Sequence, residues 1–206
     1  MGSFSGKIRN IDDVLFKRMC FSWAENNPVP LQDLRYLELS HWNFSGLIQQ
    51  GELIVHHLIA KECLEIFHEL FDLKFPIHKM RLIDEYKADD LLSMQDNNTS
   101  GFCSRKITGK PAVFSHHSYG LAIDINPLYN PYIKNDKLIL PESGKKYLDR
   151  QEDRPGMLTG SDHCCQVFKA RSWYWGGEWQ DPTCKDYQHF CKAPRAWQGD
   201  FSILSF

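Results

Sequence analysis

The sequence predicts an α+β fold in which helices flank a small antiparallel sheet. Apolar residues recur at helical spacing between residues 58 and 73, whereas the strand-like runs at 51–55 and 79–84 are short. The two patterns are mixed along the chain, with no internal repeat and no low-complexity tract. This mixture favours helices packed against a small sheet.

Length and charge narrow the class of protein further. A chain of 206 residues is expected to form one domain, or one domain with an N-terminal extension. The net charge is -2 and both signs are spread along the chain, so no basic field points to nucleic acid. No apolar run is long enough to span a bilayer.

Residues 1–50 have mixed polarity and several aromatic side chains, and we expect an irregular extension packed on a catalytic domain at 51–206. Within the domain, residues 51–55 read as a strand. The helix at 58–73 has the clearest pattern, and Pro76 follows its end.

The later elements are shorter and separated by polar segments. We expect a strand at 79–84, a loop at 89–101, a bend and buried strand at 113–126, a polar loop around a short helix at 140–157, and a helix at 161–170 capped by Ser161 or Asp162.

Residues 115–126 carry the most informative pattern. Alternation places Leu121, Ile123 and Ile125 on one face of a strand and Asp124 on the other. A buried carboxylate is unfavourable unless it is neutralised, and a divalent cation would do this. Gly120 permits a sharp bend through which His117 can approach the same point. Taken alone, the pair is better explained as a buried, turn-capping aspartate preceded by two exposed histidines.

A later segment favours the metal site. His189 follows an aromatic and glycine-rich stretch at 171–190, and Asp186 stands three residues before it. Two histidines and one carboxylate leave an open position on a catalytic zinc ion. A further carboxylate beside such a site can transfer protons.

Three motifs together resemble a known family. Ser-x-His-x-x-Gly-x-Ala-x-Asp, Trp-x-Trp-Gly-Gly-x-Trp and Asp-x-x-His-Phe are similar to those of the D-alanyl-D-alanine carboxypeptidase family of zinc peptidases, which includes VanY-type enzymes. The resemblance runs from about residue 100 to residue 190. It implies the small α+β fold that these enzymes share with the hedgehog signalling domain.

The resemblance also implies roles for individual residues. The zinc ligands would be His117, Asp124 and His189, and Asp186 would be the catalytic carboxylate. Ser115 would hydrogen-bond the substrate. An arginine would hold the substrate and polarise the developing oxyanion, with Arg105 the first candidate and Arg81 the second.

The tryptophans at 173, 175 and 179 are expected to pack the core, and Trp175 is the one expected to line the substrate cleft as well. The chain departs from many relatives at Glu178, where they have Asp, and at Cys191, where they often have an acidic residue. Both positions could alter hydrogen bonds around the metal ligands.

Other histidines are weaker candidates. His116 is expected to point away from the metal, at the surface or behind a ligand, because neighbouring strand residues face opposite sides. His56 and His57 form a second pair, but the sequence offers them no carboxylate partner. His68 begins a His-Glu-x-x-His pattern in which Asp72 replaces the second histidine.

The seven cysteines are expected to be mostly free thiols, with one possible bridge between Cys184 and Cys191. The chain is expected to be monomeric. It would reside in the cell envelope if a leader was removed, and in the cytoplasm otherwise.

The predicted function is a zinc-dependent D-alanyl-D-alanine carboxypeptidase acting on peptidoglycan stem peptides or other peptides containing D-amino acids. The alternatives are an L-alanyl-D-glutamate endopeptidase, which Asp186 slightly favours, and a non-catalytic zinc-stabilised binding module.

Overall fold

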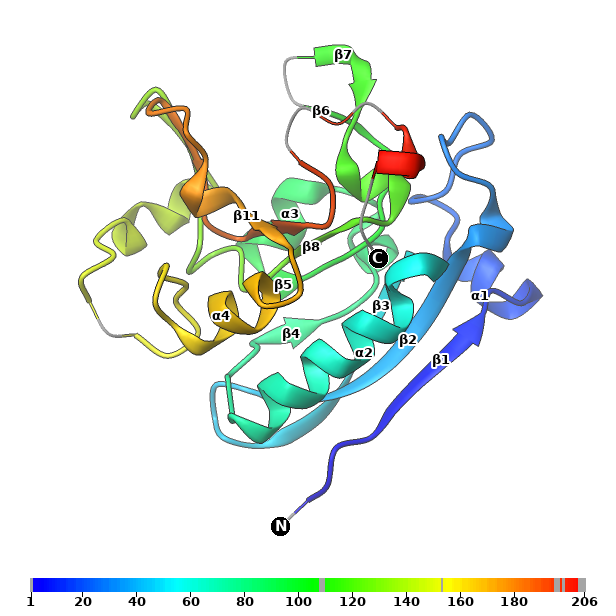
Figure 1. The fold of residues 1–206 in the computed structure, drawn as a ribbon, viewed down its shortest axis with the longest axis horizontal. Coiled ribbons are helices and arrows are strands. Elements are labelled where there is room, and N and C mark those ends of the chain that lie inside the picture. Colours follow the sequence, from blue (N-terminus) through cyan, green and yellow to red (C-terminus); the bar gives the residue numbers. More distant parts are fainter. Residues whose placement is uncertain (1, 108–109, 153, 195–196, 198, 204–206) are drawn as a thin grey trace.

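The computed structural model describes residues 2–107, 110–152, 154–194, 197 and 199–203. Helices and small, mostly antiparallel sheets are mixed along the chain, which confirms the α+β class (Figure 1). The more detailed hedgehog-like arrangement stays a prediction.

The N-terminal part forms a three-stranded antiparallel sheet in the order β1-β2-β3. Its strands are β1 (Gly6–Asn10), β2 (Leu34–Trp42) and β3 (Ile48–His56), and a short helix, α1 (Asp13–Arg18), follows β1. The expectation of irregular structure in residues 1–50 is therefore wrong. The proposed boundary at residue 50 lies inside β3, and the division into extension and domain stays a prediction.

Burial on both faces of β2 explains why its sequence does not alternate. Leu37 and Leu39 belong to the main core, whereas Leu34 and Tyr36 pack in a second cluster with α1. A strand covered on both faces has no polar side that would produce period-two alternation.

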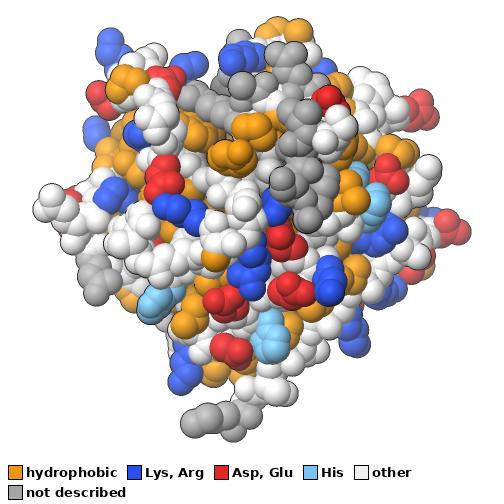
Figure 2. Space-filling view, in the orientation of Figure 1, with side chains coloured by type: hydrophobic (Ala, Val, Ile, Leu, Met, Phe, Trp, Pro, Cys, Tyr) orange, Lys and Arg blue, Asp and Glu red, His pale blue; other side chains and the backbone are white. Residues whose placement is uncertain are grey.

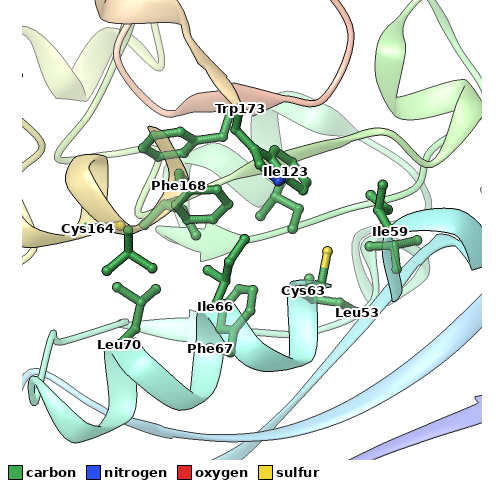
Figure 3. Packing of buried hydrophobic residues seen from close by; sticks show 14 of the residues in the cluster. Leu53, Ile59, Cys63, Ile66, Phe67, Leu70, Ile123, Cys164, Phe168 and Trp173 are labelled. Atoms are coloured by element: carbon green, nitrogen blue, oxygen red, sulfur yellow. The ribbon is translucent and has the colours of Figure 1, made fainter. Parts of the chain in front are cut away.

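The long helix α2 (His57–Asp72) confirms the helix expected at 58–73. Its buried residues include Ile59, Cys63, Ile66, Phe67 and Leu70. Figure 3 shows α2 side chains such as Ile66 directed toward Ile123 and Phe168, and Leu53 of β3 lies in the same cluster. The helix thus joins the N-terminal sheet to the part of the chain that carries the motifs.

Between residues 79 and 114 the elements are short. The strand expected at 79–84 is reduced to β4 (Lys79–Met80), which pairs in parallel with β5 (Asn98–Thr99). The expected loop at 89–101 contains α3 (Asp90–Gln95), which Asp89 caps by accepting a hydrogen bond from the Leu92 amide. The remaining elements are the 3₁₀ turn η2 (Ile83–Tyr86) and the hairpin of β6 (Lys106–Ile107) and β7 (Lys110–Phe114).

Two three-stranded sheets follow. One has the order β11-β13-β8 and consists of β8 (Ala122–Asp124), β11 (Tyr174–Trp175) and β13 (His189–Cys191). The other has the order β10-β9-β12 and consists of β9 (Tyr132–Lys134), β10 (Leu138–Leu140) and β12 (Cys184–Asp186).

One helix and several 3₁₀ turns complete the fold. The expected helix at 161–170 is α4 (His163–Lys169), and its cap is Asp162, whose side chain accepts a hydrogen bond from the Cys165 amide. The turns are η1 (Leu31–Asp33), η3 (His116–Tyr119), η4 (Glu142–Tyr147), η5 (Gly176–Glu178) and η6 (Phe201–Ile203).

All seven cysteines are free, so the possible Cys184–Cys191 bridge is wrong. Among the described residues, no helix has both the length and the apolar character required to cross a membrane. Figure 2 shows basic and acidic side chains interspersed on the visible face.

Candidate metal centre

Three side chains that are far apart in the sequence converge in the buried interior. His117 Nε2 lies 3.2 Å from Asp124 Oδ2, and His189 Nδ1 lies 3.0 Å from Asp124 Oδ1. His117 Nε2 and His189 Nδ1 are 3.3 Å apart. Each of the three residues is at most 7% exposed.

The pairing of β8 with β13 positions two of them. His189 lies directly opposite Asp124 in this antiparallel pair. Opposed residues share one face of a sheet, so the imidazole and the carboxylate are neighbours. The other face of β8 belongs to the core, where Leu121, Ile123 and Ile125 are fully buried.

His117 arrives from η3, whose two ends fix its position. Ser115 begins the turn, and its hydroxyl accepts a hydrogen bond from the His117 amide. Gly120 ends the turn in the left-handed conformation, with φ 67°. A Cβ atom at this position would lie 2.6 Å from the backbone nitrogen of His56. The bend attributed to Gly120 therefore depends on both its backbone conformation and its lack of a side chain.

A backbone carbonyl fixes the orientation of the His117 ring. His117 Nδ1 lies 2.7 Å from the Gly101 carbonyl oxygen and donates a hydrogen bond to it, which leaves the Nε2 lone pair directed at the cluster. Ligating histidines are commonly oriented in this way. Gly101 itself has no space for a side chain, because a Cβ atom would lie 2.5 Å from the Ile54 carbonyl oxygen.

Electrostatics within the cluster indicate a site for positive charge. Burial would raise the pKa of Asp124, but the adjacent imidazoles of His117 and His189 outweigh it and hold that pKa below its ordinary value. Burial opposes protonation of His189, yet its hydrogen bond to Asp124 and its contact with Cys191 raise its pKa well above the ordinary value. The proton on His189 thus neutralises the charge of the Asp124 carboxylate, and a metal ion bound at the same place could neutralise it instead.

The donor set and its spacing fit zinc. Two imidazole nitrogens and one carboxylate are common zinc ligands, and ligands about 2.0–2.1 Å from a tetrahedral ion lie about 3.3 Å from one another. The three observed separations lie between 3.0 and 3.3 Å. His116, His189 and Cys191 form an overlapping group, but the Cys191 thiol donates a hydrogen bond to the Ala193 carbonyl oxygen.

Asp186 lies at the end of β12 with a buried carboxylate oxygen, Oδ1, that has no hydrogen-bond partner among the described residues. Burial raises the pKa of Asp186 to about 7, against the opposing effect of His189. Gly176 makes room for this residue, since a Cβ atom there would lie 2.3 Å from the Asp186 carbonyl oxygen.

Arg105 is tied to the turn that carries His117. Its amide donates a hydrogen bond to the Ser118 hydroxyl, and its carbonyl oxygen accepts hydrogen bonds from Ser118 and from the Ser115 amide. Its guanidinium pairs with Asp90 at 3.1 Å, and its buried Nε has no partner among the described residues. Although burial opposes its charge, Asp90, Cys103, Asp124 and Asp186 together raise the pKa of Arg105.

The second candidate arginine has other partners. Arg81 pairs with Glu85 at 3.3 Å and lines a cavity beside the β2–β3 hairpin. Within the described residues, no hydrogen bond or ion pair joins Arg81 to His117, Asp124 or His189.

Trp173 and Trp175 pack in the main core, as expected. Trp175 is 5% exposed, and its indole N–H donates a hydrogen bond to the Tyr187 carbonyl oxygen, so its burial does not support a place in the substrate cleft. Trp179 is half-buried and stands edge-on to His189, with ring centroids 6.0 Å apart. His116 is buried beside His189 and Trp197, which fits the second of its two expected places, behind a ligand. Burial and the neighbouring histidines lower its pKa to about 3.

Several groups around the cluster were not anticipated. Gly101 orients His117, and Asp90 holds Arg105. Gln188 is buried, and its Oε1 has no hydrogen-bond partner in the part of the chain that the structure describes. Sequence spacing offered no signal for Gly101 or Asp90, because their partners come from other elements. Gln188 lies inside the Asp-x-x-His-Phe motif and could have been singled out there.

Comparisons with known proteins agree with the motifs. Neither the curated proteins nor the solved structures contain a match to this chain. A family model supports a metallopeptidase and covers the three converging side chains and Asp186, but not Arg105. Residues 108–192 match the family described as D-alanyl-D-alanine carboxypeptidase, the family that the sequence motifs resemble.

Proposed function

We propose that this protein is a zinc-dependent peptidase that cleaves the terminal peptide bond of peptidoglycan stem peptides ending in D-Ala-D-Ala. The observation that carries the proposal is the convergence of His117, Asp124 and His189 at separations suited to one ion. When bound, zinc would polarise the scissile carbonyl and lower the pKa of water to about 7.

Asp186 is the proposed general base and general acid. Its Oδ1 atom is buried and has no hydrogen-bond partner among the described residues, so it is available as a proton acceptor. Burial raises the pKa of Asp186, which favours its accepting a proton from water during the reaction. Asp186 would take a proton from the attacking water and return it to the leaving amine.

Arg105 and Ser115 are the proposed substrate-binding residues. The guanidinium of Arg105 would stabilise the negative charge that develops on the carbonyl oxygen. The Arg105 backbone makes two hydrogen bonds with the Ser118 hydroxyl and one with the Ser115 amide, and this supports a fixed backbone position relative to His117. The Ser115 hydroxyl would have to exchange its long bond from the His117 amide, 3.4 Å, for one with the substrate.

An L-alanyl-D-glutamate endopeptidase is the second candidate. The observation favouring it is the aspartate at 186, since the motif resemblance places aspartate there in the endolysin-like branch. Both candidates use the same chemistry and differ in the bond that is cut.

The test combines metal content with product analysis. We expect about one zinc ion per chain at His117, Asp124 and His189, and release of D-Ala from a pentapeptide ending in D-Ala-D-Ala, measured by mass spectrometry. His117→Ala should lose both the metal bound there and activity, whereas Asp186→Asn should keep that metal and lose about 10²–10⁴-fold in kcat. His68→Ala, a change on the exposed face of α2, is the matched histidine control.

Other outcomes separate the alternatives. Release of new L-Ala carboxyl ends from purified peptidoglycan, without D-Ala release, would identify the endopeptidase. Metal binding without turnover on either substrate would identify a binding module. Full activity of Asp186→Asn would remove Asp186 from the mechanism.

A further inference from the structure

A second cluster of possible metal ligands lies at the start of α2. Asp33 ends η1, His56 ends β3 and His57 begins α2, and each offers a ligand atom within 4.8 Å of the others. The histidine pair had no evident carboxylate partner in the sequence. The antiparallel register of β2 and β3 supplies one, because Leu34 lies opposite His56 and thus brings Asp33 beside the pair.

The cluster combines a fixed ring with an accessible one. His56 is 3% exposed, its ring packs against Phe201, and its amide donates a hydrogen bond to the Gly120 carbonyl oxygen at 2.9 Å. The ring of His57 is exposed, with its centroid 4.6 Å from that of His56. An ion could therefore enter from solvent beside His57 and bind a ring that is already held in place.

The charges nearby allow a cation. Asp33 contributes a negative charge, and the guanidinium of Arg35 contributes an opposing positive charge. That guanidinium is engaged elsewhere, because its Nη1 donates hydrogen bonds to the carbonyl oxygens of Gln32 and Leu34. The positive end of the α2 helix dipole also opposes a cation, which makes the Asp33 carboxylate essential to the site.

We propose that Asp33, His56 and His57 bind a second divalent transition-metal ion, such as Zn²⁺, at a site separate from His117, Asp124 and His189. Two imidazoles and one carboxylate suit zinc or its transition-metal neighbours, whereas Ca²⁺ and Mg²⁺ prefer oxygen ligands. Water would complete the coordination. The three ligand atoms lie within 4.8 Å of one another, and rotation of the exposed His57 side chain can bring them to the roughly 3.3 Å that separates ligands on a tetrahedral ion.

One existing hydrogen bond competes with the ion. His56 Nδ1 accepts a long bond, 3.3 Å, from the Leu58 amide, which caps α2. A neutral imidazole has one acceptor nitrogen, so His56 cannot bind an ion and keep this bond. The second site is therefore weaker than the catalytic one, and zinc should fill it last.

The experiment isolates this site by removing the other. A His117→Gln, His189→Gln double variant, stripped with a chelator and checked for folding by circular dichroism, is titrated with ZnCl₂ in a calorimeter. We expect one equivalent of zinc to bind. Adding His57→Gln should abolish this binding, and adding Asp33→Asn should weaken it at least tenfold. Adding His68→Gln should leave it unchanged, because His68 pairs with Asp72 elsewhere on α2.

Either of two results overturns the proposal. The first is no zinc binding by the folded double variant. The second is binding that survives His57→Gln and Asp33→Asn or is lost with His68→Gln. Peptidase activity does not enter the readout, so failure of the proposed function would leave this result unaffected.

Discussion

At the scale of single residues, Gly176 determines where Asp186 can sit. A methyl group at position 176 would lie 2.3 Å from the Asp186 carbonyl oxygen and 2.8 Å from its Cβ atom. Gly176→Ala should displace the carboxylate and lower kcat by about 10–100-fold, because small misplacements of catalytic groups are expensive. Zinc content should not change, since none of the three proposed ligands is displaced directly.

Gly160→Ala is the matched control for this change. The nearest atoms to a Cβ at position 160 are 3.6 and 3.7 Å away, which is ordinary contact. Steady-state kinetics and zinc analysis of both variants test the effect. Equal kcat values for the two alanine variants would show that Asp186 tolerates the shift or has no catalytic role.

The two candidate arginines can be separated by paired substitutions. Arg105→Gln should lower kcat/KM by about 10²–10³-fold, the effect typical of losing one donor to an oxyanion. Arg81→Gln should change it less than about threefold, because Arg81 pairs with Glu85 away from the cluster. The comparison is made by kinetics on the same D-Ala-ending pentapeptide. A large loss in Arg81→Gln alone would reverse the assignment.

Much of the candidate site could be predicted from the sequence because its residues lie in compact motifs. The spacing within 115–126 and 186–190 singled out the three side chains that the fold brings together. Gly101 and Asp90 could not be predicted, since each acts on a side chain held by a different element. The motif does not indicate which indole is buried, so the choice of Trp175 over Trp179 for the substrate cleft stays a prediction.

At the scale of elements, a helix or strand with one buried face was easier to predict from the sequence than one buried on both faces. The amphipathic α2 has one buried face and was recognised from its spacing. The strand β2 is buried on both faces and was missed. The sequence also could not show that α1 and η1 lie beside the sheet, because that arrangement depends on contacts between distant residues such as Arg18 and Glu52.

Glu52 joins three elements and makes stability depend on pH. It receives two hydrogen bonds from Arg18 of α1, at 2.6 and 2.8 Å, and one from the hydroxyl of Tyr36 in β2. Chiefly through Arg18, and against the effect of burial, the pKa of Glu52 falls below its ordinary value. The unfolded chain therefore binds a proton at higher pH than the folded chain does.

Protonation of Glu52 at low pH should therefore destabilise the folded protein. Stability from Glu52 is fully present above the unfolded pKa, about 4.3, and is lost as pH falls through the lower folded value. Urea unfolding at pH 7 and pH 3.5 should show a larger loss in the wild type than in Glu52→Gln, by about 1 kcal/mol after allowing for solvent screening. Parallel pH profiles for the two proteins would contradict this account.

At the scale of the whole molecule, a buried lysine pairs with a glutamate of α2 and joins this helix to the C-terminal part. Lys192 follows β13, is 5% exposed, and lies 2.9 and 3.0 Å from the two carboxylate oxygens of Glu62. Glu62 also accepts a hydrogen bond from the Trp173 indole at 2.6 Å. The pair therefore holds the strand carrying His189 against the helix that supports the N-terminal sheet.

Replacing Glu62 alone should destabilise the protein more than replacing Glu62 and Lys192 together. Glu62→Ala leaves the Lys192 ammonium buried without its counter-charge and should destabilise the protein by about 2–4 kcal/mol in urea unfolding. The double variant Glu62→Gln, Lys192→Met removes both charges and retains an acceptor for Trp173, so it should lose less. A double variant as unstable as Glu62→Ala would show that the buried ammonium is not the source of the loss.

The exact opposition of Asp124 and His189 across β8 and β13 makes the chain sensitive to changes in length. Inserting or deleting one residue between 186 and 189 would exchange the sides of His189 and Phe190, placing a phenyl ring in the metal cluster and an imidazole in the apolar core. The same insertion at 180–182, before β12, would only lengthen a connection at the surface. In a library of single-residue insertions, variants with the insertion between 186 and 189 should therefore lose zinc, whereas variants with the insertion at 180–182 should keep it.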